Sequence, residues 1–242
     1  MMLATSWDDG HPDDRRLAER LARHGIAATF FVPIGNSEGR PVMATADLRA
    51  LAADGFEIAA HTLDHRRLPP LGEAEARRQI AEGRRRLEDL LGAPVVGFAY
   101  PGGHAGRHGR RLAAEAGFAY ARTTRMFCLS PGRDPLMMAT TAQLYPHRAG
   151  AVLRNWARRG GGLDRLRLAA RWLAAGGLEA ASTALLDEAL ARGGVLHLWG
   201  HSWEIEELGL WPVLDRLLAA AAARVPPERR VDLRALAASI PS

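Results

Sequence analysis

Two short stretches of this sequence carry side chains that could hold a metal ion and activate water. One reads TSWDDG from residue 5, and the other reads HTLDH from residue 61. Asp9, His61 and His65 offer one carboxylate and two imidazoles, a set suited to a divalent metal that keeps positions open for water and substrate. Asp8 lies beside the expected ligand carboxylate and could serve as a base.

Each stretch alone also fits ordinary structure. Adjacent aspartates often cap a helix, and a single histidine is more often a core or surface residue than a ligand. The combination is more informative, because the four side chains supply a ligand set and a base together. Zinc is the first choice of ion for two histidines and a carboxylate, although other first-row divalent ions bind such sites.

Two later stretches could complete a catalytic cleft. In the first, Tyr100, Pro101 and Gly102 follow a predicted strand. Glycine there would let substrate approach the backbone, and a backbone N–H after the tyrosine could stabilise an oxyanion, although a plain turn is the alternative. In the second, LWGH from residue 198, His201 would face the metal across the cleft as a general acid.

Aromatic residues flank this last histidine. Trp199 and Trp203 could form walls that suit a sugar ring, although tryptophan is more often simply part of the core. Glu204 could orient His201 or only cap the following segment. We expect His197 to be buried and hydrogen-bonded rather than catalytic.

The elements that must position these residues alternate between strand and helix. Strands are predicted at 3–7, 28–32, 56–60, 95–100, 118–122, 142–145 and 195–199. Helices are predicted at 13–24, 48–53, 73–91, 107–116, 179–192 and 210–223, the second of them capped by Thr45 or Asp47. This alternation predicts one parallel α/β domain over residues 1–242, with about seven strands. The polar clusters follow strands, at the edge where parallel α/β folds build active sites.

Composition limits the class of protein. The chain has 242 residues, of which 48% are hydrophobic, so a sizeable core is expected. A single cysteine, Cys128, excludes an internal disulfide framework. No apolar run approaches the roughly 18 residues of a membrane span, and no secretory signal is evident, so we expect a cytoplasmic protein. All 32 basic residues are arginine, mostly on amphipathic helices, which does not favour a nucleic-acid partner.

In their order along the chain, these motifs resemble the polysaccharide deacetylases, the chitooligosaccharide deacetylase-like group of metal-dependent carbohydrate esterases. The matching stretches are TSWDDG at 5–10, ATFFVP at 28–33, GFEIAAHTLDH at 55–65, FAYPG at 98–102, AGFAYA at 116–121 and LWGH at 198–201. The resemblance implies a distorted (β/α) barrel with fewer than eight regular units. It also implies Asp8 as base, Asp9, His61 and His65 as metal ligands, and His201 as acid.

Three positions depart from the family's usual pattern. The third motif usually opens with an arginine that orients the base, but Ala99 holds that place here. The second histidine is usually followed by proline, but here by Arg66. The tryptophan-bearing fourth motif has no clear equivalent, and Trp156 is a candidate only by position. Some other group must therefore orient Asp8, or its basicity is tuned differently.

The reaction that the resemblance implies is hydrolysis of an N-acetyl or other N-acyl group on an amino sugar, either free or linked to a carrier. Metal binding would lower the pKa of water from about 16 towards about 7. Asp8 would take the proton, and protonated His201 would supply one to the leaving amine. Two alternatives remain open, namely a hydrolase of the same fold acting on a non-sugar or cyclic amide, and a basic binding module without catalysis.

The segment 151–175 matches the family least. It contains six arginines and two tryptophans, with apolar positions spaced for one helix face. One interpretation is a helix packed on the barrel with its arginines in solvent. The other is a helical insertion or lid, hinged at the glycines 160–162, whose Arg158 and Arg159 bind an anionic part of the substrate.

Overall fold

Parallel strands form the centre of the protein. The computed structural model describes residues 1–241. The strands are β1 (Met2–Asp8), β2 (Thr29–Val32), β3 (Glu57–Ala60), β4 (Gly97–Ala99), β5 (Tyr120–Arg122), β6 (Ala142–Gln143), β7 (Val195–Gly200) and β8 (Arg230–Val231). Seven of them run in the order β5-β4-β3-β2-β1-β7-β6, while β8 pairs with β1. The predicted α/β fold with about seven parallel strands is confirmed, and the strands curve into a half-barrel.

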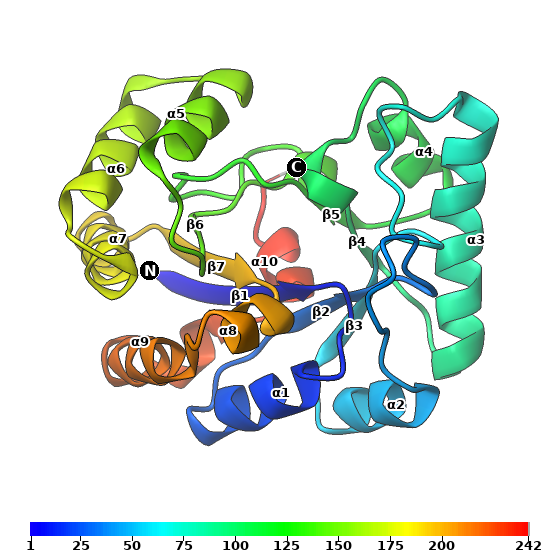
Figure 1. The fold of residues 1–242 in the computed structure, drawn as a ribbon, viewed down its shortest axis with the longest axis horizontal. Coiled ribbons are helices and arrows are strands. Elements are labelled where there is room, and N and C mark those ends of the chain that lie inside the picture. Colours follow the sequence, from blue (N-terminus) through cyan, green and yellow to red (C-terminus); the bar gives the residue numbers. More distant parts are fainter. Residues whose placement is uncertain (242) are drawn as a thin grey trace.

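Helices cover the convex side of this half-barrel (Figure 1). The helices are α1 (Asp14–Arg23), α2 (Thr45–Ala53), α3 (Glu73–Leu91), α4 (Gly109–Glu115), α5 (Ala149–Arg158), α6 (Leu163–Ala174), α7 (Leu178–Arg192), α8 (Ser202–Glu207), α9 (Trp211–Arg224) and α10 (Leu233–Ala238), the last of which packs on the concave side. Short 3-10 turns are η1 (Pro101–Gly103), η2 (Pro135–Met137) and η3 (Pro227–Arg229). In Figure 1, α1 and α2 lie along the lower side, α3 and α4 on the right, and α5 to α7 on the left.

Helix boundaries follow local sequence where a strong stop signal is present. The bounds of α3 are those predicted, because Gly92 adopts a left-handed C-cap with φ of 67°. The predicted cap of α2 is wrong: Ala44 occupies the N-cap, so Thr45 and Asp47 lie inside the helix. Helix α8 was not predicted. It is six residues long and follows His201 directly.

The sheet separates two clusters of buried side chains. On the convex side, large residues such as Trp7, Phe30 and Phe98 pack against the surrounding helices. On the concave side, a smaller cluster combines Ala4, Ala59 and Ala99 with larger residues, and Leu233 and Leu236 of α10 pack among them. In Figure 1, α10 lies behind the strands, where it fills part of the half-barrel. This leaves the carboxyl ends of the strands as the edge where polar side chains gather.

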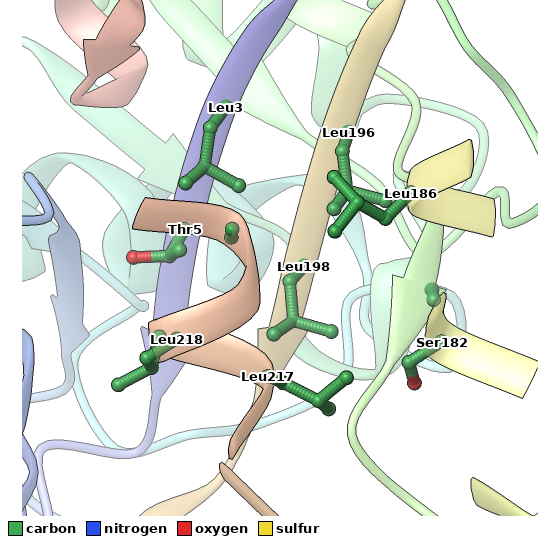
Figure 2. Close-up of a pocket in the computed structure, with 10 residues that line it drawn as sticks. Leu3, Thr5, Ser182, Leu186, Leu196, Leu198, Leu217 and Leu218 are labelled. Carbon is green, nitrogen blue, oxygen red and sulfur yellow. The ribbon is translucent and has the colours of Figure 1, made fainter. Parts of the chain in front are cut away.

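One small cavity lies within the convex layer, between β1 and β7 and the helices α7 and α9. Figure 2 shows leucine side chains converging on it, with only Thr5 and Ser182 offering polar atoms. Its volume is about 20 Å³, room for roughly one water molecule. The cavity is therefore a packing defect of the core rather than a substrate site. Over residues 1–241, no helix is long and apolar enough to cross a membrane.

Candidate active site

The aspartate pair lies where β1 turns out of the sheet. Asp8 is the last residue of β1, and Asp9 and Gly10 form the turn with φ values of 80° and 57°. A Cβ on Gly10 would lie 2.8 Å from a methyl carbon of Val32, so this turn needs glycine. Both carboxylates are buried, with 3% of each residue exposed. The tight turn thus directs two adjacent carboxylates into one cleft.

The two histidines follow β3 and meet Asp9. His61 Nδ1 donates to the carbonyl of Ala99 at 2.8 Å, which leaves Nε2 facing Asp9 Oδ1 at 3.7 Å. His65 Nε2 lies 3.1 Å from the same oxygen. One ligand atom from each of the three residues lies within 4.8 Å of the others. A carbonyl partner behind a histidine is the usual way of presenting the other ring nitrogen to a metal.

The electrostatics of this group suit a cation. Burial alone would raise the pKa of Asp9, but the close imidazole of His65 and the charges of His201, His61 and His65 hold it well below its usual range. Burial lowers the pKa of His61 to about 4, so its ring is neutral, as a ligand must be. Asp9 Oδ1 is buried without a hydrogen-bond partner among the described residues. The three residues therefore fit a divalent ion, which would complete their unmet coordination.

Backbone strain is concentrated at the same place. Asp9, Thr62 and His65 have φ values of 80°, 69° and 61°, which are uncommon for residues other than glycine. Three such residues around one site indicate that the surrounding fold holds the backbone in place to aim these side chains.

A residue that the sequence analysis missed holds the expected base. Arg122, at the end of β5, is fully buried, and its Nη2 lies 2.6 and 2.5 Å from the two carboxylate oxygens of Asp8. Its guanidinium contacts the rings of Phe31 and Trp199, 5.0 and 4.9 Å from their centroids. Arg122 is in register with Ala99 on the adjacent strand β4. The missing arginine is thus supplied from one strand further along the sheet.

His201 lies across the cleft, just after β7, and is tied to Glu204 on α8. Its Nδ1 lies 2.6 Å from Glu204 Oε2, which also accepts a hydrogen bond from Gln143 at 3.0 Å. Burial lowers the pKa of His201, but the hydrogen bond and charge of Glu204, with the charges of Asp9 and Asp8, raise it to about 9. His201 Nε2 faces Asp9 Oδ2 at 4.0 Å.

These side chains line one open cavity of about 220 Å³. Its walls are Asp8, Asp9, Glu38, His61, His65, Arg67, Gly102, Thr124, Trp199, His201 and Trp203. Trp203 donates its indole N–H to Asp9 Oδ2 at 2.9 Å. The guanidinium of Arg40 stacks on the Trp203 ring, 3.3 Å from the ring centroid. The two tryptophans expected at the cleft therefore line it, and one of them also holds an expected ligand.

Of the three residues after β4 that were expected at the cleft, two are buried away from the cavity and one borders it. Tyr100 is fully buried, and its hydroxyl donates to the carbonyl of Leu136 at 2.9 Å, so its side chain does not reach the cavity. Pro101 is also buried and has no N–H to offer. Only Gly102 lines the cavity, and it carries the first backbone N–H after the tyrosine. His197 is buried as expected, with Nε2 2.9 Å from Ser6 Oγ.

The arginine-rich segment contains two helices joined by the glycine turn. Arg165 of α6 is buried and donates to four backbone carbonyls between Asn155 and Gly161 and to that of Met126. The expectation that the arginines of this segment all lie in solvent is wrong for Arg165, because it satisfies the carbonyls that end α5. Arg159 instead reaches the cleft margin and donates to the carbonyls of Gly102 and Gly103.

Comparison with known proteins gives the same family as the motifs. The family model described as polysaccharide deacetylase matches residues 1–121. A chitooligosaccharide deacetylase from Sinorhizobium fredii is 36% identical over 67 residues, which cover 28% of this chain and 29% of that protein. Among solved structures, a family 4 carbohydrate esterase from Streptomyces lividans in complex with acetate has a TM-score of 0.54 at 17% identity, covering 91% of this chain and 89% of that one. Puue allantoinase has a TM-score of 0.70 at 16% identity, with 98% and 88% covered.

These likenesses differ in what they establish. At such low identity, the solved structures show a shared fold alone. The chain spans less than half the length of the curated relatives it matches, between 29% and 43% of each. The family model covers half of the chain and includes Asp8, Asp9, His61 and His65. By that match, the protein belongs to the polysaccharide deacetylase family.

Proposed function

We propose that the protein is a metal-dependent hydrolase that removes an N-acetyl, or other N-acyl, group from an amino-sugar substrate. The observation that carries this proposal is that Asp8, Asp9, His61, His65 and His201 line one cavity. Membership of the deacetylase family supports the amino sugar as substrate. The proposed role of Asp9, His61 and His65 is to hold the ion, with zinc the first choice. When bound, a divalent ion would supply Lewis-acid chemistry by acidifying water and polarising the acyl oxygen.

The remaining residues would move the protons. Asp8, held through both oxygens by Arg122, would accept the proton of the attacking water. The N–H of Gly102 could donate to the oxygen that gains negative charge as the acyl carbon becomes tetrahedral. His201, protonated below about pH 9, would donate to the nitrogen of the leaving amine. Without that proton, the nitrogen is a poor leaving group and the bond to the acyl carbon would break slowly.

Acetate release from a panel of substrates tests the proposal. Zinc-loaded protein would be incubated with N-acetylated mono- and oligosaccharides, with sugars linked to a carrier, and with a cyclic amide. We expect acetate from at least one sugar, and a loss of at least about 10²-fold in Asp8→Asn with zinc still bound. Asp47→Asn, a surface aspartate on α2, is the matched control.

Other outcomes separate the alternatives. Ring opening of the cyclic amide without acetate release from any sugar would favour a non-sugar amidase. Absence of bound zinc together with absence of turnover would leave a basic binding module. Loss of zinc in Asp8→Asn would mean that the roles of the two aspartates are exchanged. The cytoplasmic location expected from the sequence stays a prediction.

A further inference from the structure

Two arginines at one margin of the cleft, Arg67 and Arg159, and the two beside that margin in the chain, Arg125 and Arg158, lack the acidic partners that the arginines of α3 and α4 have. On α3 and α4, arginines pair with glutamate or aspartate, as Arg66 before α3 does with Glu75 at 2.9 Å. Over residues 1–241, no carboxylate lies within ion-pair distance of Arg67, Arg125, Arg158 or Arg159. Like charges gathered without counter-charges repel each other, so this arrangement favours an anionic ligand.

Two of these four flank the turn that borders the cavity. The guanidinium of Arg67 lies against Gly102, where a Cβ would be 3.4 Å from Nε and 3.6 Å from Cζ. On the other side of the turn, Arg159 donates from Nη2 to the Gly102 carbonyl and to Thr124 Oγ1, both at 3.0 Å. Arg67, Gly102 and Thr124 line the same cavity as the two aspartates and His201. The positive charge therefore adjoins the proposed reaction centre.

The two guanidiniums are placed for different tasks. Arg159 is half-buried and fixed by backbone carbonyls, whereas Arg67 is exposed and makes no hydrogen bond within the described chain. Arg67 thus keeps all its donors for a ligand. The same positive charges act on nearby His104. Burial lowers the pKa of His104, and the charges of Arg159, Arg67 and Arg158 lower it further. Guanidinium groups bind oxyanions through paired N–H donors, which a lone point charge cannot match.

We infer that Arg67, backed by Arg159, forms a subsite for an oxyanion substituent of the substrate, a phosphoryl or carboxylate group attached to the acylated sugar. The inference rests on the proposed function, because it places the substituent on the Gly102 side of the cavity while the acyl group faces Asp8 and His201. It also limits the part of the arginine-rich segment that contacts substrate to the end of α5.

Arg67→Gln tests the subsite, with Arg66→Gln as the matched control. The control removes the same charge from the adjacent position, where it is neutralised by Glu75. The substrates are N-acetylglucosamine 6-phosphate and 1-phosphate, N-acetylmuramic acid for the carboxylate, and the neutral methyl glycoside of N-acetylglucosamine. We expect Arg67→Gln to raise KM about tenfold for at least one anionic sugar. For the neutral sugar, the factor by which KM rises should be at least fivefold smaller. Whether phosphate or carboxylate responds identifies the anion.

Binding without turnover keeps this test separate from that of the reaction. Titration calorimetry with the same sugars would use zinc-loaded Asp8→Asn protein, with and without Arg67→Gln. A loss of affinity confined to an anionic sugar would support the subsite even if no sugar were deacetylated. Equal effects on anionic and neutral sugars, or equal effects of Arg66→Gln and Arg67→Gln, would overturn it. Because Arg67 is exposed and makes no hydrogen bond to any other described residue, the variant is expected to fold.

Discussion

Arg122 Nη2 contacts both carboxylate oxygens of Asp8, at 2.6 and 2.5 Å, in a part of the protein closed to solvent. The two residues are 114 positions apart and come from strands that are not neighbours in the sheet. A buried pair of this kind fixes the orientation of the carboxylate, and neither charge can be removed without leaving the other unpaired.

Arg122→Gln is therefore expected to reduce both activity and stability. Leaving Asp8 buried without its cation should cost roughly 3 kcal/mol of unfolding free energy. Misplacement of the base should lower kcat by about 10²-fold with little change in KM. Urea unfolding and steady-state kinetics measure the two effects, and the amount of bound zinc checks that the metal site is intact. A normal kcat in a destabilised variant would give Arg122 a purely structural role.

Returning an arginine to the adjacent strand gives a stronger test of positioning. Ala99 and Arg122 are in register, so their side chains leave the sheet on the same side. In the double variant Ala99→Arg with Arg122→Ala, we expect kcat to recover at least about tenfold over Arg122→Ala alone. Thermal unfolding of both variants checks that the added side chain is accommodated. A folded double variant with no gain in kcat would contradict this prediction.

The pH profile should report the pair of His201 and Glu204. The pKa of His201 is raised above its ordinary value to about 9, so activity that needs its proton should fall as pH rises through about 9. Glu204→Gln removes the charge and the strongest partner of the imidazolium, which should move this alkaline limb down by about one unit or more. Measurement of kcat/KM from pH 6 to 10 decides the point, and an unmoved limb would exclude His201 as its source.

The same pair links pH to stability. The folded-state pKa of His201 lies above the unfolded value near 6.5. The stability that its protonated form contributes is therefore fully present below about pH 6.5 and lost as pH rises through about 9. Glu204→Gln should reduce the stability difference between pH 6 and pH 9.5.

The ligand motifs were predictable because they are local. HTLDH and WDDG each place their residues within five positions, directly after apolar strands, and the α3 boundaries follow from periodicity and Gly92. Arg122 was not predictable in this way, since its contact with Asp8 depends on which strands lie near each other in the folded sheet. The available signal was a charged residue at the end of the apolar predicted strand 118–122.

The direction of a side chain at a strand end is also a tertiary property. Tyr100 follows β4 as His61 follows β3, yet one side chain points into the core and the other into the cleft. Arg165 shows the same limit, because its burial depends on where α5 ends. Composition alone does not distinguish Arg165 from the surface arginines of the same segment.

Zinc should stabilise the protein through Asp9. Ligand binding to the folded state alone stabilises it by about 2.7 kcal/mol at a hundredfold excess over Kd. We therefore expect a zinc-dependent rise in Tm that a chelator reverses and that Asp9→Asn and His61→Ala abolish. Asp47→Asn should keep the rise. A full rise in Asp9→Asn would show that zinc binds elsewhere.

Tyr100→Phe tests the buried position of the tyrosine. The variant loses one hydrogen bond, to the carbonyl of Leu136, and should be less stable by about 1 kcal/mol. Because the hydroxyl does not reach the cavity, kcat/KM should stay within about twofold. A tenfold loss of kcat/KM with an unchanged Tm would return Tyr100 to the substrate site.

The protein should be more stable when the carboxyl group of Asp14, the first residue of α1, is neutral. It is fully buried, and neither carboxylate oxygen has a hydrogen-bond partner among the described residues. Burial raises its pKa well above the usual value, and the charges of Asp9 and Asp8 raise it further, while Ser202 and His201 offset only part.

The sign of the effect follows from this shift. Above about pH 4 the unfolded chain releases the proton that folded Asp14 retains, so stability falls by up to about 1.4 kcal/mol per pH unit. Asp14→Asn is neutral in both states, and its gain in Tm over the wild type should therefore grow from pH 5 to pH 8. Asp13→Asn, at the neighbouring partly exposed position, is the control for removal of a carboxylate from the same turn. A lower Tm for Asp14→Asn at pH 8, in zinc-loaded and chelated protein alike, would mean that the carboxylate is ionised and supports the turn beneath the two aspartates.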